Sequence, residues 1–345
     1  MRRSLSAAVL ASLSAFALAA CSIGGGGGDS ADGSGTVVSY NTPQEWANWD
    51  DVLKQFTEST GIEAPNDPKN SGQTLAALTA EKESPAADVA YYGIVFGMQA
   101  QDEGLVEPYK PEGFDDVDED LKDPEGNWTT VHQGAVAMLV NTKELGDVEV
   151  PKCWNDLTDP KYKDKVGYLD PAQAAVGYSV LTGANLALGG SLDDFKPGLE
   201  WAKKMADNGV KNPAQTATSS VQQGEIPILI DADFNGYQLA AEDSPIEVVY
   251  PCEGTLSIPY TMSLVKNGPN GDNGKKLLDY VLSDEAQKLF AESYLKPVKD
   301  IELPESAKEA FPSDEEYNKL VKGTDFNKMN EVQDGVVEEF QKVTG

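Results

Sequence analysis

Arginine and histidine are nearly absent from this sequence. Its 345 residues include two arginines, Arg2 and Arg3, and one histidine, His132. A single histidine excludes the paired-histidine zinc motif of metalloproteases and leaves a histidine-based catalytic triad unsupported. Arginine is the side chain that most often binds carboxylate or phosphate in a forked geometry. Its scarcity therefore counts against a tightly held anionic ligand.

Basic residues of any kind are few. The chain has 27 Lys and Arg residues against 57 Asp and Glu residues, which gives a net charge of −30. A field of this sign repels phosphate backbones, so nucleic acid is not expected as a partner. Long apolar runs are also missing. The stretch Ala7–Ala20 is too short to span a membrane, and the mean hydropathy of −0.39 leaves no other candidate.

The first of only three cysteines marks an N-terminal targeting segment. Residues 1–20 have a basic start, an apolar stretch and small residues before Cys21, which is typical of a signal peptide. The sequence LAAC resembles the bacterial lipobox, in which the cysteine is acylated; an ordinary signal peptide with an incidental cysteine is the alternative. The glycine-rich residues 21–35 would form a flexible tether. We expect an extracytoplasmic protein held at the bacterial cell membrane by lipid alone.

Cys153 and Cys252 are the two remaining cysteines. In an extracytoplasmic compartment they are more readily paired than free, so we expect a disulfide. Zinc requires more soft ligands than two cysteines and one distant histidine. Neither a metal site nor another cofactor is therefore expected.

Strand-like and helix-like segments alternate along the chain from Thr36 onward. Thr36–Tyr40 is a short β-branched strand, and Glu45–Thr60 carries apolar residues at helical spacing, ended by Gly61. Repeated βα units predict the α/β class. Single cores stop growing at roughly 250–300 residues, which favours two lobes for a mature chain of this length.

Five segments together resemble one protein family. The resemblance is to bacterial extracellular solute-binding proteins of the type 2 periplasmic-binding fold, in the branch that binds iron, thiamine, polyamines and phosphonates. It is carried, in this order and spacing, by YNTPQEWANWDDVLKQFTESTGIEA (Tyr40–Ala64), SPAADVAYYGIVFGMQAQDEGLVEPY (Ser84–Tyr109), LTDPKYKDKVGYLDP (Leu157–Pro171), VQQGEIPILIDADFNGYQLA (Val221–Ala240) and NGKKLLDYVLSDEAQKLFAESYLKPVKD (Asn273–Asp300).

The resemblance implies a two-lobed α/β fold, each lobe a mostly parallel sheet flanked by helices. Lobe 1 would comprise residues 36–128 and 254–300, and lobe 2 residues 129–253 and 301–345. A small solute would bind in the cleft between the lobes. The closed protein, a monomer without enzymatic activity, would present that solute to the permease subunits of an ABC importer.

Iron binders of this family hold the metal with a histidine, a glutamate and a pair of tyrosines. The matching positions here are Gln44, Gly93, Phe234 and Asn235. Ferric iron requires anionic oxygen or nitrogen ligands, which glycine and phenylalanine side chains do not supply. The sequence therefore disfavours iron as the ligand.

Aromatic and acidic residues gather at the predicted cleft turns. Aromatic faces together with carboxylates suit an organic cation, through cation–π attraction and charge-assisted hydrogen bonds. The predicted ligand-binding residues are Trp46, Trp49, Tyr91, Tyr92, Gln173, Asp231, Asp233, Phe234, Tyr237 and Tyr260. They favour an amine such as a polyamine or a thiamine-like molecule. The alternatives are core packing for the aromatic residues and helix capping for the two aspartates.

An anion is the competing ligand. A predicted helix begins at about Pro171, and the amides of a helix start hold phosphate or phosphonate without arginine. Asp170, at the predicted N-cap, would repel a second negative charge. An aminophosphonate would satisfy both ends, with its amine at Asp231 or Asp233 and its phosphonate at the Gln173 amides. This hypothesis ranks just behind the amine, and a surface adhesin or a hydrolase ranks last.

Overall fold

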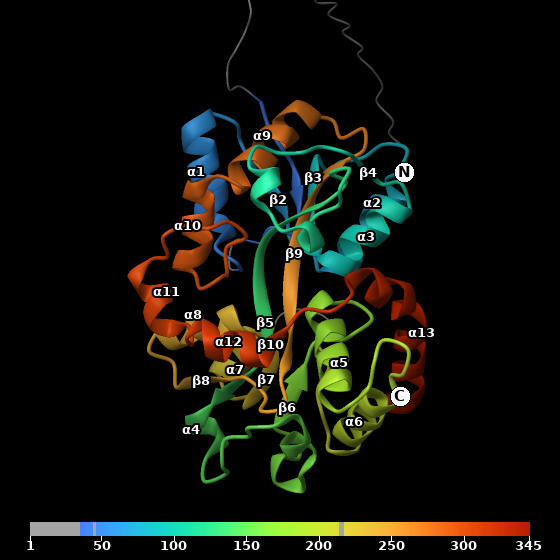
Figure 1. Ribbon diagram of the computed structural model, residues 1–345, viewed down its shortest axis with the longest axis vertical. Helices are drawn as coiled ribbons and strands as arrows, with labels where there is room; N and C mark the ends of the chain where they lie inside the picture. Colours follow the sequence, from blue (N-terminus) through green and yellow to red (C-terminus); the bar gives the residue numbers. More distant parts are fainter. Residues whose placement is uncertain (1–34, 44–45, 214–216) are drawn as a thin grey trace, which may run out of the picture. The chain divides into compact units, whose positions relative to one another are not determined.

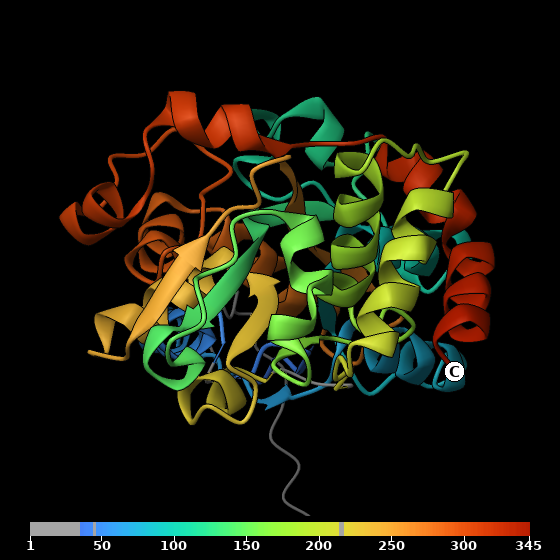
Figure 2. The ribbon, with the colours of Figure 1, turned by 90° about the horizontal axis from the view of Figure 1, so that it is seen from below.

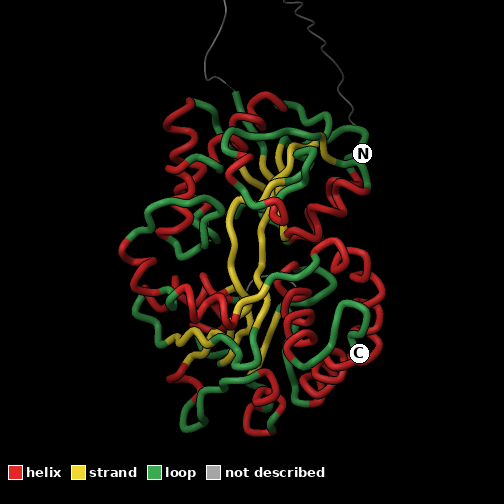
Figure 3. Tube along the Cα trace, viewed as in Figure 1, coloured by secondary structure: helices red, strands yellow, loops and turns green. Residues whose placement is uncertain are grey.

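Two long strands, β5 (Thr129–Asn141) and β9 (Thr255–Val265), run through the centre of the computed structural model, which describes residues 35–43, 46–213 and 217–345 (Figure 1). They pair antiparallel where residues 129–135 of β5 lie beside residues 257–262 of β9. All other strands are arranged around this pair. Figure 3 shows the strands in the middle with helices on either side.

One end of the sheet is built on β9 and β3 (Val89–Gly93), which pair antiparallel. β1 (Ser39–Tyr40) pairs parallel with both β3 and β2 (Asn66–Asp67), and β4 (Val106–Glu107) pairs antiparallel with β9. The helices of this part are α1 (Trp49–Thr60), α2 (Ser71–Ala80), α3 (Ile94–Asp102), α9 (Gly271–Val281) and α10 (Asp284–Glu292).

The other end is built on the second half of β5, which pairs antiparallel with β7 (Ile228–Ala232) and β8 (Ile246–Val249). β6 (Val166–Tyr168) runs parallel to β7. The helices here are α4 (Thr142–Leu145), α5 (Ala175–Ala187), α6 (Lys196–Asp207), α7 (Thr218–Gln222) and α8 (Asp233–Ala241). Four 3-10 turns are Phe114–Asp116, Glu119–Leu121, Trp154–Thr158 and Pro160–Tyr162.

The C-terminal segment returns across both parts. α11 (Glu305–Ala310), α12 (Asp314–Leu320) and β10 (Val321–Lys322) lead to the last helix, α13 (Phe326–Thr344). β10 pairs parallel with the start of β9, and α13 packs against both α3 and α6. Figure 2 shows α13 along the outer side of α6.

Local sequence accounts for these elements. In α1 the apolar side chains of Trp49, Val52, Leu53 and Phe56 follow helical spacing and are all buried, and Gly61 ends the helix with a φ of 73°. α9 and α10 are separate helices, because Ser283 caps the second one by accepting from the Ala286 amide. The predicted helix at about Pro171 begins only at Ala175.

The α/β class is confirmed, and the sheets are mixed rather than mostly parallel because β5 and β9 run against most of their neighbours. Cys153 and Cys252 form a disulfide with an S–S distance of 2.07 Å. Among the described residues, every helix is too short or too polar to traverse a bilayer. The signal peptide, Cys21 and almost all of the tether lie outside the described residues, and the division into lobes stays a prediction.

Candidate functional site

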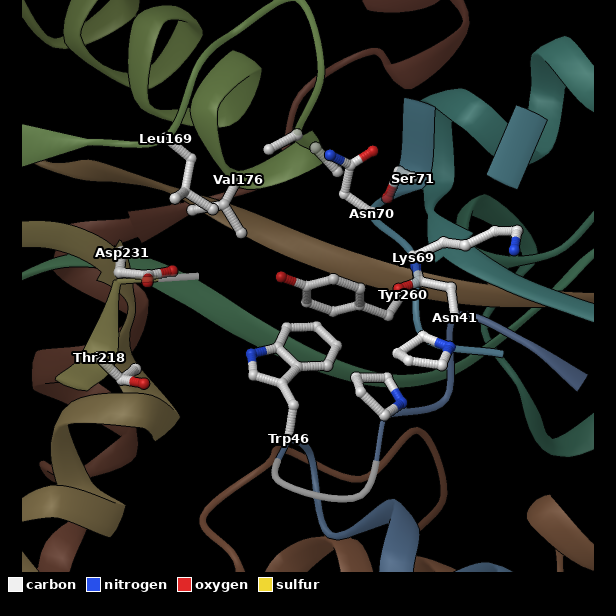
Figure 4. A pocket seen from close by; sticks show the side chains of 14 residues that line it. Asn41, Trp46, Lys69, Asn70, Ser71, Leu169, Val176, Thr218, Asp231 and Tyr260 are labelled. Atoms are coloured by element: carbon white, nitrogen blue, oxygen red, sulfur yellow. The ribbon is translucent and has the colours of Figure 1, made fainter. Parts of the chain in front are cut away.

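A pocket of about 230 Å3 lies where several elements from both ends of the sheet meet (Figure 4). β7 contributes Asp231, β9 contributes Tyr260, and the segment before α1 contributes Trp46. The remaining lining comes mostly from the starts of helices. The described lining residues are Asn41, Pro43, Trp46, Pro68, Lys69, Asn70, Ser71, Leu169, Ala174, Ala175, Val176, Thr218, Asp231 and Tyr260.

Asp231 carries the negative charge of this pocket. Its side chain is 1% exposed, and its Oδ1 accepts a hydrogen bond from the Ala232 amide at 2.7 Å. Its Oδ2 is buried without a hydrogen-bond partner among the described residues. Burial raises the pKa of this carboxyl to about 7, and the neighbouring Ala232 amide and Asn235 side chain act in the opposite direction. Buried polar atoms are normally satisfied, so an unsatisfied carboxylate oxygen on a pocket wall points to a ligand that donates hydrogen bonds.

Tyr260 stands beside Asp231 with a second unsatisfied group. The residue is 2% exposed, and its hydroxyl has no hydrogen-bond partner among the described residues. Burial, and then the nearby charges of Asp231 and Asp233, hold the pKa of this phenol well above its usual range. In Figure 4 the Tyr260 hydroxyl and the Trp46 indole nitrogen point toward the side on which Asp231 lies.

Trp46 forms an aromatic wall at the same end. Its ring meets those of Tyr91, Phe234 and Tyr260 edge to face, with centroids 5.7, 5.3 and 4.9 Å apart. Such pairs fix ring orientation and are each worth about 0.5–1.5 kcal/mol beyond burial. These contacts fix the position of the Trp46 ring, which gives the pocket an aromatic surface of the kind that attracts cations.

Two helix starts also line the pocket, and Figure 4 shows Val176 of α5 on the side of Asp231 and Ser71 of α2 on the other side. α2 begins at Ser71, with Asn70 as its N-cap, and α5 begins at Ala175, with Ala174 as an N-cap that makes no side-chain bond. The first amides of a helix have no intrahelical partner and carry a partial positive charge. These two helix starts, called the anion end below, can therefore bind an anion without arginine.

Lys69 is the basic residue of the described lining, but its ammonium points away from Asp231. Its ammonium pairs with Asp67 at 2.5 Å and lies 4.4 Å from the centre of the Tyr40 ring. Figure 4 shows this ammonium pointing away from Asp231. The positive potential at this end of the pocket thus comes mainly from backbone amides.

Asp170 does not occupy the expected N-cap. Its carboxylate accepts from the Ala172 amide at 2.9 Å and from Gln173 Nε2 at 3.0 Å, within the turn before α5. Gln173 is absent from the lining, and its carbonyl accepts from the Gly72 amide at 3.0 Å. The N-cap of α5 is Ala174, so the predicted N-cap position of Asp170 is wrong, while its repulsion of an anion stays a prediction.

Asp233 and Tyr237 belong to a separate network. Asp233 Oδ1 accepts from the amides of Ala135 and Phe234, each at 2.9 Å, and its Oδ2 accepts from the Tyr250 hydroxyl at 2.7 Å. Tyr237 and Tyr250 join their hydroxyls at 3.1 Å. Burial raises the pKa of Asp233 to about 6. Every oxygen of this carboxylate is satisfied, and neither Asp233 nor Tyr237 lines the pocket.

Four predicted aromatic residues lie in the core. Trp49, Tyr91, Tyr92 and Phe234 are each 0% exposed and absent from the lining. Tyr91 shares a 2.8 Å hydrogen bond with Nε2 of His132, whose pKa burial holds well below its usual range. Three of the ten predicted ligand residues, Trp46, Asp231 and Tyr260, therefore line this pocket, and ligand contact by any of the ten stays a prediction.

Four features of the pocket lining were not among the residues predicted from the sequence. They are the first turn of α2, the start of α5, Asn41 and Thr218. The sequence NSGQ over residues 70–73 does carry a signal, because Asn70 and Gln73 form a capping box. The start of α5 carries none, since its contribution is backbone alone.

The family model described as bacterial extracellular solute-binding protein matches residues 84–332. This chain belongs to that family. A relative from Salmonella typhimurium, provisionally named a 2-aminoethylphosphonate-binding periplasmic protein, is 30% identical over 89% of this chain and 87% of its own length. The spermidine/putrescine-binding periplasmic protein of Escherichia coli is 25% identical over 76% of this chain and 77% of its own.

A solved structure has the same architecture as this chain. The periplasmic binding protein AfuA from Actinobacillus pleuropneumoniae, with fructose-6-phosphate bound, has a TM-score of 0.75 and 26% identity, covering 89% of this chain and 97% of its own. The solute-binding protein described here is thus a substrate-binding component of ABC import. Its relatives are periplasmic or extracellular transport proteins rather than enzymes.

Proposed function

We propose that this solute-binding protein takes a small zwitterion with a phosphonate or phosphate at one end and an ammonium at the other. The observation that carries the proposal is the polarity of the pocket. Asp231, with an unsatisfied buried oxygen, and the first turns of α2 and α5, with their free amides, line the same pocket. A single molecule with both charges complements both features.

This geometry reverses the order of the two ligand hypotheses. A polyamine carries ammonium groups at both ends, and one of them would face the positive ends of two helices. Asp231 is the sole carboxylate among the described lining residues, so a second ammonium would have no partner there. The 30% identical relative named for 2-aminoethylphosphonate supports the same ligand class.

A sugar phosphate is the second candidate. The helix starts would hold its phosphate, and Asp231, with its pKa raised to about 7, would accept from or donate to a sugar hydroxyl. The bound fructose-6-phosphate in the similar AfuA structure favours this class. Ferric iron remains disfavoured, because the described lining offers one carboxylate and one phenol and no histidine.

Isothermal titration calorimetry separates these ligands. The panel is 2-aminoethylphosphonate, ethylphosphonate, fructose 6-phosphate, putrescine and ferric citrate. We expect 2-aminoethylphosphonate to bind tightest, with ethylphosphonate weaker because it lacks the amine. Tighter binding of putrescine would overturn the assignment of the helix starts, and tighter binding of fructose 6-phosphate would favour the second candidate.

We further propose that a lipid on Cys21 holds the protein, as a monomer of two lobes, at the outer face of the cell membrane. Replacing Cys21 with Ala should release the protein into the medium or the periplasm. Retention of the variant in washed membranes would contradict this anchor.

A further inference from the structure

Two glycines allow close contacts with the segment that begins α5: Gly72 in the first turn of α2, and Gly93 at the end of β3. The Gly72 amide, in the first turn of α2, donates to the Gln173 carbonyl at 3.0 Å. A methyl group added at Gly72 would lie 2.9 Å from that carbonyl oxygen. A methyl group added at Gly93 would lie 2.3 Å from the Cβ of Ala175, the first residue of α5.

The same segments form the anion end of the pocket. Ser71 and Ala175 line it, and the Ser71 hydroxyl accepts from the Gly93 amide at 3.2 Å. Residues 71, 72 and 93 fall in the proposed lobe 1, whereas residues 173 and 175 fall in the proposed lobe 2. Contact between them therefore joins the two proposed lobes beside the proposed anion end.

We infer that Gly72 and Gly93 form a latch that holds the two lobes together at the anion end. Two helix starts with positive ends repel each other when they face across a small pocket. The Gly72–Gln173 hydrogen bond and the side-chain-free contact at Gly93 offset this repulsion, and a bound anion removes it. The latch thus sets affinity for every ligand with that anion, whereas Asp231 sets preference for the amine.

This inference rests on the proposed lobes and on the proposed anion end. It predicts that the latch affects the affinity for ligands with and without an amine equally. Gly72→Ala and Gly93→Ala each place a methyl group where no space exists, which should weaken binding by about five- to 100-fold. 2-Aminoethylphosphonate and ethylphosphonate should lose affinity by the same factor, so the ratio of their Kd values stays at its wild-type value.

Gly271→Ala is the matched control. Gly271 begins α9, and a methyl group added there meets no atom within 4 Å. This variant should bind both ligands as the wild type does. Alanine in the first turn of α2 is a better helix former than glycine, so Gly72→Ala should fold and keep its Tm.

Small-angle X-ray scattering reads the latch independently of the ligand assignment. Without ligand, Gly72→Ala and Gly93→Ala should have a larger radius of gyration than the wild type and Gly271→Ala. Failure of the wild type to bind any ligand of the panel would overturn the proposed function. The radii of gyration of the ligand-free proteins would still test the latch. Equal radii of gyration in all four proteins, or Kd values of both latch variants within twofold of the wild type, would overturn the latch.

Discussion

Asp231 and Asp233 are two residues apart in the sequence and nearly equally buried, yet their carboxylates differ in hydrogen bonding. Asp233 has three hydrogen bonds and a partner for each oxygen. Asp231 has one, to the next amide in the chain, and its Oδ2, on the pocket wall, has no partner among the described residues. Burial raises the pKa of both carboxyls. The difference indicates that Asp233 serves the fold, and it supports the proposal that Asp231 binds the ligand.

The largest expected effect is on ligand affinity. Asp231→Asn should weaken 2-aminoethylphosphonate binding by about 2–5 kcal/mol, because a buried ammonium loses its charge partner. Asp233→Asn keeps Oδ1, the atom that accepts both amides, and should change Kd by less than about threefold. Calorimetry on both variants checks the comparison, and equal losses for the two would break it.

The next effect is on stability, and its sign differs between the two positions. The folded-state pKa of Asp231, about 7, lies above the ordinary value of 3.8, so its neutral form is favoured on folding and stability is lost as pH rises from about 4 to about 7. Asp231→Asn stays neutral and should raise the free energy of unfolding at pH 8, by at most about 4 kcal/mol.

Asp233→Ala should do the reverse. It leaves the amides of Ala135 and Phe234 and the Tyr250 hydroxyl without their acceptor. The expected loss is about 2–4 kcal/mol in the free energy of unfolding. Urea unfolding at pH 8 measures both variants. A destabilised Asp231→Asn protein would contradict the claim that this carboxylate is unsatisfied.

A smaller effect is expected on the pH dependence of binding. Asp231 must be ionised to hold an ammonium, and its pKa in the free protein is about 7. Affinity of the wild type should therefore fall about tenfold between pH 8 and pH 6. The phosphonate titrates in the same range, so Asp231→Asn serves as the control that retains only the contribution of the ligand. Parallel pH profiles for the two proteins would remove Asp231 from the site.

The smallest effect concerns Tyr260. Tyr260→Phe removes a hydroxyl that has no partner among the described residues and should weaken 2-aminoethylphosphonate by about 0.5–1.5 kcal/mol. Tyr92→Phe removes an equally unpartnered hydroxyl that lies away from the pocket lining. It should leave Kd unchanged. A larger loss at Tyr92 than at Tyr260 would show that the pocket has been placed at the wrong aromatic residues.

The contrast between the two aspartates also shows how far the sequence could be read. The aliphatic run that ends at Asp231 correctly predicts a buried strand, and strand alternation would place Asp231 and Asp233 on one face. That rule fails because β7 ends at Ala232 and α8 begins at Asp233, which turns the second carboxylate toward Ala135. A one-residue change of secondary structure thus separates a pocket residue from a structural one.

The anion end was harder to predict for a different reason. Its positive charge is that of backbone amides, which almost every residue has, so no residue type in the sequence marks it. The start of α5 depends on the turn in which Asp170 accepts from the Ala172 amide, and this turn delays the helix from about Pro171 to Ala175. The amphipathic helices, by contrast, follow directly from the spacing of buried residues, as in α1.

The most direct test combines a change in the protein with a change in the ligand. The ratio of the Kd of ethylphosphonate to that of 2-aminoethylphosphonate is measured for the wild type and for Asp231→Asn at pH 8. If Asp231 holds the ammonium, the ratio should be about 30 or more in the wild type and fall to within about threefold of unity in the variant. A ratio that is the same in both proteins would contradict this assignment.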